Sequence, residues 1–141
     1  MPTDVRLSGL DVVTDKGIGI DLPIFGSLGS QFAVTYTTID QAAANAKNLL
    51  LTNHGERVMQ PTFGCNLHKT MFENQTDQLV DLVITTITSQ MEYWLPYIFI
   101  NDLQVTHSPD YNTMNINIKI SLKNNTFDTR SIDLQIEQTS A

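Results

Sequence analysis

The segment between residues 49 and 72 holds the side chains of this sequence that could most readily do chemistry. Cys65 and His68 are three residues apart, and His54 lies nearby. A cysteine activated by a histidine can act as a thiolate nucleophile, and both residue types bind zinc. A structural zinc site normally needs four protein ligands, whereas the sequence has a single cysteine and no closely spaced pair of histidines. We therefore expect no metal and no cofactor, and we interpret Cys65 as a small buried side chain.

Acidic side chains in and after this segment raise a second kind of chemistry, the hydrolysis of a glycosidic bond. Such an enzyme needs two carboxyl groups roughly 5 to 10 Å apart, one of them with a raised pKa. Glu56, Glu73 and Asp77 are the candidates. An acidic chain offers such groups by chance, and no stretch between them is typical of a sugar-binding cleft. A lysozyme-like enzyme is therefore kept as the alternative, and we expect no catalytic residue.

The neighbouring charges Glu56 and Arg57 have simpler uses. They follow Gly55 in a segment that also contains Pro61 and Gly64, a composition typical of a shaped loop. Charged side chains in such a loop bind backbone carbonyl groups, the charges of a partner, or each other. If the two form a buried ion pair, removal of one member costs about 3–5 kcal/mol. The segment is thus predicted to be a rigid loop clamped between two helices.

Composition limits the classes of protein to consider. The 141-residue chain is 41% hydrophobic, which is enough for one domain with its own core. Its net charge of −7 opposes binding to phosphate backbones, so we expect no nucleic acid partner. The longest apolar stretch, residues 79–100, contains Asp81 and Glu92, which makes it too polar to span a bilayer, and we expect no membrane partner. Without a visible secretory signal, and with one cysteine, the sequence is typical of a soluble intracellular domain.

Residues 1–36 show no sustained hydrophobic period, because glycines and prolines interrupt short apolar pieces. Two interpretations stay open: a mobile tail, and an extended arm that becomes ordered on partners. We favour the arm, because several of its side chains are more apolar than a solvated linker requires: Leu22, Ile24, Phe25, Leu28 and Phe32. The chain is accordingly divided into an N-terminal arm, residues 1–36, and a single domain, residues 37–141.

The first helix of this domain is predicted from a capping box. The hydroxyl of Thr38 can accept from a free backbone N–H, and Gln41 can reach back to the cap. Asn53 and Gly55 suit the left-handed residue that ends a helix. The predicted apolar stripe consists of Ile39, Ala42, Ala43, Ala46, Leu49 and Leu50.

The second helix is predicted to be the longest element. Asn74 or Thr76 can cap it, and Pro96 stops it at Leu95. Its apolar stripe consists of Val80, Val83, Ile87, Met91, Trp94 and Ile98. We expect this stripe to pack in the core rather than to line a ligand pocket.

After Pro96 the hydrophobic period changes from that of a helix to that of a strand. Three strands are predicted, one beginning at residues 103–105, one over residues 114–122 and one over residues 132–136. Such a meander has one apolar face, which the two helices can cover. The sequence therefore predicts an α+β fold: two main helices packed on a three-stranded antiparallel sheet, with an extended N-terminal arm.

The segment from residue 49 onward resembles a known family. Its run L-L-x-T-x-x-G-E-R-x-x-x-P-x-F-G-C-x-L, followed by Phe72-Glu73 and a long helix, is similar to the baseplate wedge and sheath-initiator family of contractile-tailed bacteriophages. That family has a counterpart in the type VI secretion baseplate. The likeness covers residues 38–137. Its most specific part is P-x-F-G-C-x-L followed by F-E, since alternating strands alone would not distinguish the family.

The resemblance implies that the protein has a structural role in a virion. It would be part of a tail baseplate, which is assembled in the host cytoplasm. Members of the family dock against a bundle of other wedge proteins. Their sheet resembles the interlocking domain of the tail sheath, so that the first sheath ring forms on it. Wedge proteins and the tail sheath protein are the expected partners, with the tail tube as a further one. The positions that match the pattern, to which we assign loop shaping and wedge docking, are Gly55, Glu56, Arg57, Pro61, Phe63, Gly64, Cys65, Leu67 and Phe72.

One position departs from the family pattern. Many relatives end the long helix with Glu-Pro-Arg, a motif associated with wedge docking, where this chain has Leu95-Pro96-Tyr97. The proline stop is kept and the charged pair is lost. Docking at this corner is thus expected to be more apolar, with Trp94 and Phe99 contributing as well. Core packing is the alternative for Trp94 and Leu95.

The predicted sheet suggests how a sheath could be built on this protein. An exposed sheet edge offers backbone N–H and C=O groups to an incoming strand, whose alternate side chains fix the register. The last strand of the meander is the expected sheath-binding edge, and its polar face would limit promiscuous pairing. Its residues are Ser131, Ile132, Asp133, Leu134, Gln135, Ile136 and Glu137. A generic adaptor domain that binds a peptide or protein, unrelated to any tail, is the remaining alternative.

Overall fold

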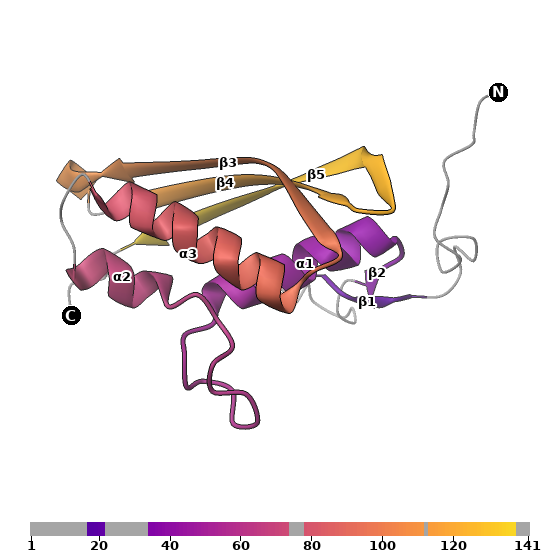
Figure 1. Cartoon of the computed structure of the whole chain (residues 1–141), viewed down its shortest axis with the longest axis horizontal. Helices are drawn as coiled ribbons and strands as arrows, with labels where there is room; N and C mark the ends of the chain where they lie inside the picture. Colours follow the sequence, from indigo (N-terminus) through magenta and orange to yellow (C-terminus); the bar gives the residue numbers. More distant parts are fainter. Residues whose placement is uncertain (1–16, 22–33, 74–77, 112, 138–141) are drawn as a thin grey trace, which may run out of the picture.

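The computed structural model describes residues 17–21, 34–73, 78–111 and 113–137 of the chain (Figure 1). Its elements are β1 (Gly19–Ile20), β2 (Val34–Thr35), α1 (Thr38–Leu51), α2 (Leu67–Glu73), α3 (Gln78–Trp94), β3 (Ile98–Ser108), the 3-10 helix η1 (Pro109–Tyr111), β4 (Thr113–Leu122) and β5 (Asn125–Glu137). Strands β3, β4 and β5 form one antiparallel sheet in that order, and β1 pairs with β2 in a separate sheet. The predicted α+β fold is confirmed. No described helix is both long enough and apolar enough to span a membrane.

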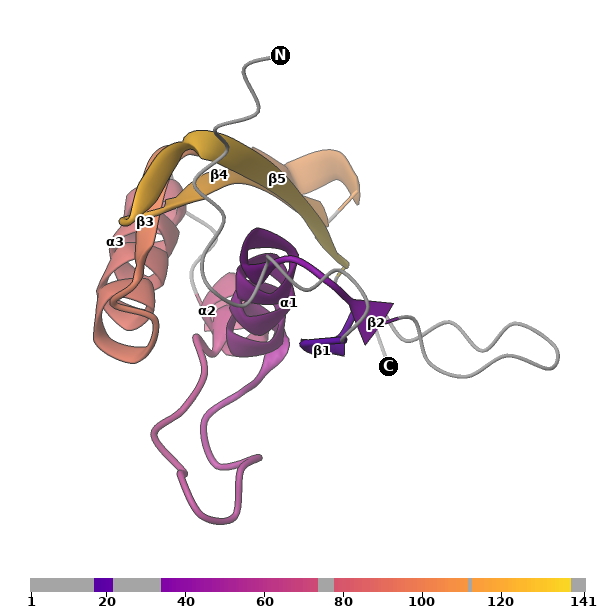
Figure 2. The same ribbon diagram turned by 90° about the vertical axis from the view of Figure 1, so that its right-hand side faces the viewer.

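Strict alternation of side chains gives the three-stranded sheet one buried face. On the central strand β4 the buried apolar side chains are Met114, Ile116, Ile118 and Ile120, and the polar Ser121 is buried as well. Ile118 pairs with Leu103 of β3 on one side and with the buried Ile132 of β5 on the other. Helices α1 and α3 lie under this face of the sheet (Figure 2). The meander and its cover are therefore arranged as the hydrophobic pattern predicts.

Helix α1 begins with a cap one residue before the predicted one. Thr37 has an extended backbone, and its Oγ1 accepts a hydrogen bond from Asp40 N over 3.3 Å. The predicted capping box of Thr38 and Gln41 is thus wrong. Thr38 already belongs to the helix, and the Gln41 amide reaches β2 instead. The predicted stripe is otherwise confirmed, since Ile39, Ala42, Ala46, Leu49 and Leu50 are buried and Ala43 packs against the core.

Helix α3 is the longest described helix and buries Leu79, Val83, Ile87 and Met91. It ends at Trp94, and Ile98 N donates to Leu95 O over 3.1 Å in the turn at Pro96. The predicted stop is therefore confirmed. Ile98 does not extend the helical stripe: it opens β3, earlier than the predicted start at residue 103. The predicted caps Asn74 and Thr76 lie outside the described residues.

Helix α2 was not predicted from the sequence. The segment up to Phe72 was expected to be a loop, whereas residues from Leu67 onward form a helix of 7 residues. Asn66, with a φ of 55°, reverses the chain before it, and Thr70 N donates to Asn66 O over 3.1 Å. So short a helix carries little periodic signal, and burial of Leu67 and Met71 stabilises it through tertiary packing.

The described residues before α1 pack on that helix. Gly19 lies so close to α1 that a Cβ there would collide with the side chain of Gln41. The buried Thr35 of β2 donates from Oγ1 to Gln41 Oε1 over 2.6 Å. The apolar side chains predicted for the arm, at residues 22–32, lie outside the described residues. The division between an arm and a domain at residue 36 stays a prediction.

Candidate docking surfaces

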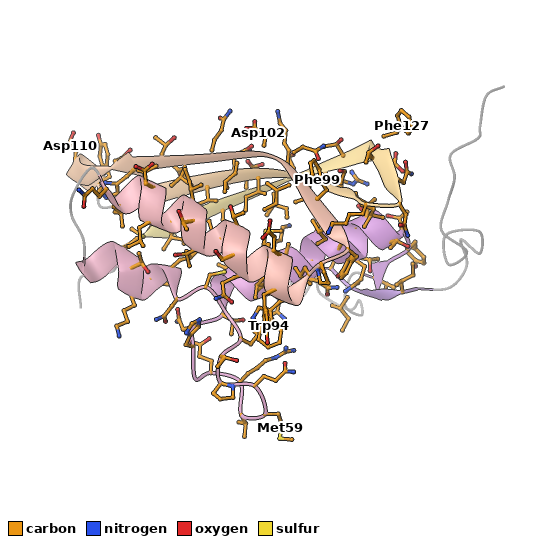
Figure 3. The ribbon with its side chains drawn as sticks, viewed as in Figure 1. Met59, Trp94, Phe99, Asp102, Asp110 and Phe127 are labelled. Carbon is orange, nitrogen blue, oxygen red and sulfur yellow. The ribbon has the colours of Figure 1, made fainter. Side chains whose placement is uncertain are left out.

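Residues 52–66, the projecting loop, extend away from the sheet and helices (Figure 3). Two hydrogen bonds close the base of this loop: Cys65 N donates to Thr52 O over 3.1 Å, and His54 Nε2 donates to Gly64 O over 2.7 Å. Gly64 has a φ of +116°, and a Cβ there would collide with the Thr52 carbonyl group. Glycine is therefore required where the two arms of the loop meet.

The outer part of the projecting loop is also held by its own backbone. Gly55 N donates to Pro61 O over 2.8 Å, and Gly55 has a φ of +88°. Beyond this bond, Gln60 N donates to Arg57 O over 3.3 Å and Phe63 N to Gln60 O over 3.1 Å. These bonds give the loop a defined shape, which agrees with the rigid loop predicted from its glycines and proline.

The carboxylate of Glu56 holds the start of the projecting loop. Asn53 N donates to Glu56 Oε2 over 2.9 Å, and Asn53 Nδ2 donates to Oε1 over 3.0 Å. The backbone hydrogen bond from Asn53, and then the one from its side chain, hold the pKa of Glu56 below its usual value. A glycosidase acid needs the opposite shift. The other two carboxyl candidates, the Glu73 side chain and Asp77, lie outside the described residues.

Arg57 stacks on Phe63 and does not pair with Glu56. The guanidinium carbon lies 4.3 Å from the centre of the Phe63 ring, a cation–π contact. The aromatic array continues edge-to-face from Phe63 to Trp94, with ring centres 5.1 Å apart, and from Trp94 to Tyr93, 5.0 Å apart. Both Glu56 and Arg57 are exposed, so the buried ion pair considered from the sequence is not formed. Arg57 instead stacks on Phe63 of the same loop, and Phe63 makes the contact with Trp94 at the end of α3.

Cys65 is buried at the base of the projecting loop, and burial raises the pKa of its thiol to about 12. A nucleophilic cysteine requires a lowered pKa, so this environment suppresses thiolate chemistry. The interpretation of Cys65 as a small buried side chain is confirmed. Within the described part of the chain, no group of three or more His, Cys, Asp or Glu side chains could hold a metal ion.

The predicted docking residues divide into supporting and exposed positions. Phe63, Cys65 and Leu67 are buried in the core cluster. Glu56 and Pro61 are exposed, as are Gly55 and Arg57. Phe72 belongs to α2, and its side chain lies outside the described residues. The structure thus gathers most of the predicted residues in one loop, but the buried ones cannot contact a partner directly.

Sequence reasoning missed the two most exposed apolar side chains of the projecting loop. Val58 and Met59 are 94% and 92% exposed, and Met59 lies at the outermost point of the loop (Figure 3). The available signal was a pair of apolar residues between Arg57 and Gln60 in a segment bounded by glycine and proline. The family pattern leaves both positions unspecified, which is why they were passed over.

The predicted sheath-binding strand forms one edge of the three-stranded sheet. β5 pairs only with β4 among the described strands, from Asn125 to Glu137. Ile132 and Ile136 are buried and Leu134 half-buried, whereas the intervening side chains are exposed: Ser131, Asp133, Gln135 and Glu137. A groove of about 270 Å³ lies beside β5 at Arg130 and Ser131, and its other lining residues include Tyr36 and residues of β2 and α1, among them Ala43. β3 is the opposite edge of the sheet.

Comparison with known proteins decides between a tail component and a generic adaptor. Residues 40–126 match the family described as baseplate wedge protein gp25. The chain belongs to this family. It is 32% identical over 94 residues to baseplate wedge protein gp25 of Enterobacteria phage T4, an alignment that spans 65% of this chain and 70% of the phage protein.

Two solved structures share the fold of this gp25-family chain. A protein from Geobacter sulfurreducens, described as a candidate tail lysozyme, has a TM-score of 0.64 at 19% identity, covering 83% of this chain and 99% of the other. A chain in the baseplate of the anti-feeding prophage has a TM-score of 0.53 at 18% identity, covering 82% of this chain and 81% of that one. At such identities the likeness concerns the fold alone.

Family membership fixes the broad role of the chain. It is a structural component of the baseplate wedge of a contractile phage tail, part of the virion tail, and it assembles with other baseplate proteins. An adaptor unrelated to a tail is thereby set aside. The recognition of this family from the loop motif is confirmed.

At the end of α3, around Leu95-Pro96-Tyr97, this chain forms a hydrogen-bonded chain through Tyr97. Asn45 Nδ2 donates to Tyr97 Oη over 2.9 Å, and Gln41 Nε2 donates to Asn45 Oδ1 over 2.9 Å. Thr35 Oγ1 in turn donates a hydrogen bond to Gln41 Oε1. The corner is therefore tied across α1 to β2. Leu95 is buried and Trp94 packs against the core, while Tyr97 is 40% and Phe99 53% exposed.

Proposed function

We propose that this chain docks to other wedge proteins through the projecting loop and the corner at Tyr97, and that the edge of β5 templates the first ring of the tail sheath by strand addition. The observation that carries the second step is the position of β5 at the sheet edge, with exposed polar side chains on alternate residues. An edge strand leaves backbone groups free for an incoming strand. The groove leaves space beside this strand at Arg130 and Ser131.

Docking through the projecting loop is supported by its construction. The loop is closed at its base and along its length by backbone bonds, and Phe63, on which Arg57 stacks, packs edge-to-face on Trp94 at the end of α3. A pre-shaped loop loses little conformational entropy on binding. The exposed Tyr97 and Phe99 give the corner an aromatic surface.

A pair of proline variants tests strand addition. Backbone N–H groups of consecutive residues in a strand point to opposite sides. Of Asp133→Pro and Leu134→Pro, one therefore removes an N–H that pairs with β4 and the other an N–H that faces the open edge. The edge-facing variant is identified as the one whose thermal unfolding changes least, since proline is tolerated at an outward-facing edge position.

The expected result is that the folded, edge-facing variant still enters baseplates but fails to start sheath polymerisation, as seen by electron microscopy of assembled tails. Sheaths of normal length on baseplates that carry this variant would rule out β5 as the template. A proline at the other edge of the sheet serves as a control, chosen between Gln104→Pro and Val105→Pro by the same unfolding criterion. Gln104 and Val105 pair with Asn117 and Ile116, the residues that also pair with Asp133 and Leu134.

Arg57 variants test docking through the projecting loop. Arg57→Ala removes the cation–π contact with Phe63, and Arg57→Lys keeps the charge but loses the planar stack. In co-expression with the wedge proteins, the alanine variant is expected to be retained most weakly and the lysine variant at an intermediate level. Lys123→Ala, which changes an exposed cation at the β4–β5 turn, is expected to be retained like the native chain. Equal retention of all four chains would assign the loop a purely structural role.

A further inference from the structure

We propose that Arg57, Val58 and Met59, the loop tip, form a knob that enters a pocket on another baseplate protein, apolar inside and with a carboxylate at its rim. This inference rests on the proposed docking through the projecting loop. It names the residues that make the contact and the chemistry of the site that receives them. The motif residues Gly55, Glu56 and Gly64 then build the knob rather than bind the partner.

The apolar part of the argument lies in the exposure and position of two side chains. Val58 and Met59 are adjacent in the chain and are 94% and 92% exposed, and Met59 lies at the outer end of the projecting loop (Figure 3). Single exposed apolar side chains are common on protein surfaces, whereas two together on a protrusion fit a concave apolar site. Methionine adapts to irregular pockets through its unbranched side chain. The partner surface is therefore a pocket large enough to receive the side chains of Val58 and Met59, and not a flat face.

The loop tip is held in place before any partner binds. Gly55 N bonds to Pro61 O below it, and Gln60 N bonds to Arg57 O across the two apolar residues. Glu56 fixes the incoming arm by accepting from Asn53. Binding would therefore fix few additional backbone dihedral angles. The conformational entropy lost on binding is correspondingly small, which favours affinity.

The charged part of the argument lies in the state of Arg57. Its guanidinium lies over Phe63, and its Nη1 reaches Gln60 Oε1 over 3.5 Å. Across the described ranges of the chain, no carboxylate lies in ion-pair range of Arg57, although Glu56 is the preceding residue. A planar guanidinium held on an aromatic ring presents its remaining donors in a fixed direction, which suits a carboxylate. A partner acid at the pocket rim would satisfy them.

The test uses the whole chain co-expressed with the wedge proteins of the same tail. The double variant Val58→Ser/Met59→Ser is expected to lose about tenfold or more of its retention on those proteins. Its thermal unfolding is expected to match that of the native chain, because both side chains lie outside the core. The control Tyr111→Ser removes another side chain that is 82% exposed, and is expected to be retained normally.

A second measurement locates the contact directly. A photoreactive benzoyl-phenylalanine in place of Met59 is expected to cross-link to one wedge protein, at a site containing apolar residues and an Asp or Glu, and the same group in place of Tyr111 is not. Native retention of the serine double variant would overturn the inference, while the proposed loop docking would stand if Arg57→Ala still weakened retention. A native chain that retained no wedge protein would overturn the proposed docking itself.

Discussion

Arg130 Nε lies 2.7 Å from Asp40 Oδ1, so an ion pair joins the edge strand β5 to the first turn of α1. The other oxygen of Asp40 accepts a hydrogen bond from Thr37 Oγ1 over 2.6 Å. Arg130 pairs with Ile120 of β4. It precedes Ile132 by two residues, so both side chains are on the same face of the sheet. One carboxylate therefore holds both the helix cap and the strand to which we assign sheath templating.

This ion pair is expected to contribute modestly to stability. The side chains of Arg130 and Asp40 are 54% and 33% exposed, and exposed pairs are typically worth about 0.2–1 kcal/mol. A double-mutant cycle with Arg130→Gln and Asp40→Asn, measured by urea unfolding at low salt, is expected to give a coupling energy in that range. The coupling should shrink at high salt. A coupling that did not depend on salt would contradict an electrostatic contact.

The hydrogen-bonded chain through Tyr97 predicts non-additive mutations. Tyr97→Phe and Asn45→Ala each break the same contact, so each is expected to lower the free energy of unfolding by about 0.5–1.5 kcal/mol. The double variant should lose less than the sum of the two. Tyr93→Phe, which removes a hydroxyl from the 75% exposed neighbour of Trp94, is the matched control and should change little. Additive losses in the double variant would show that the contact is not formed in solution.

Cys65 predicts a stability change at alkaline pH. Its folded-state pKa is raised from 9.0 to about 12, so the folded state favours the neutral thiol. The stabilising effect is fully present below pH 9 and is lost as the pH rises toward 12. Relative to Cys65→Ala, the native chain should therefore lose stability more steeply across this interval in chemical denaturation. Parallel curves for the two chains would show that the thiol is not desolvated.

The lysozyme-like alternative predicts hydrolysis of peptidoglycan, whereas a structural docking role predicts none. Glu56 has a lowered pKa and is held by Asn53, which is unsuited to a general acid. The native chain is expected to release no soluble fragments from peptidoglycan above a buffer control. Turnover that Glu56→Gln or Glu73→Gln abolished would overturn the structural interpretation of this protein.

The parts of the fold set by long hydrophobic periods were predictable from the sequence. The alternation from Met114 to Leu122 and the stripe through Val83, Ile87 and Met91 predicted the sheet and the long helix, and burial follows both patterns. Short elements carry too few periods for such a prediction. Helix α2 and the pairing of Gly19 with Thr35 depend on tertiary packing, so neither was visible beforehand.

The candidate site was predictable in location but not in its internal contacts. Glycine, proline and aromatic residues in one segment indicated a shaped loop. The sequence could not show that Glu56 binds Asn53 while Arg57 stacks on Phe63, because adjacent opposite charges equally suit an ion pair. The cap at Thr37 was missed for a similar reason: Thr37 and Thr38 are both capping residue types, and only the backbone conformation separates them.

Hydrogen–deuterium exchange on the gp25-family chain, alone and with purified tail sheath protein, tests strand addition most directly. If the edge of β5 receives a sheath strand, the edge-facing amides among residues 131–137 become protected on complex formation, since each gains a hydrogen bond. Amides of β3, at the opposite edge, should exchange as before. Unchanged exchange over residues 131–137 in a complex that forms, with protection appearing elsewhere, would contradict the proposed templating by β5.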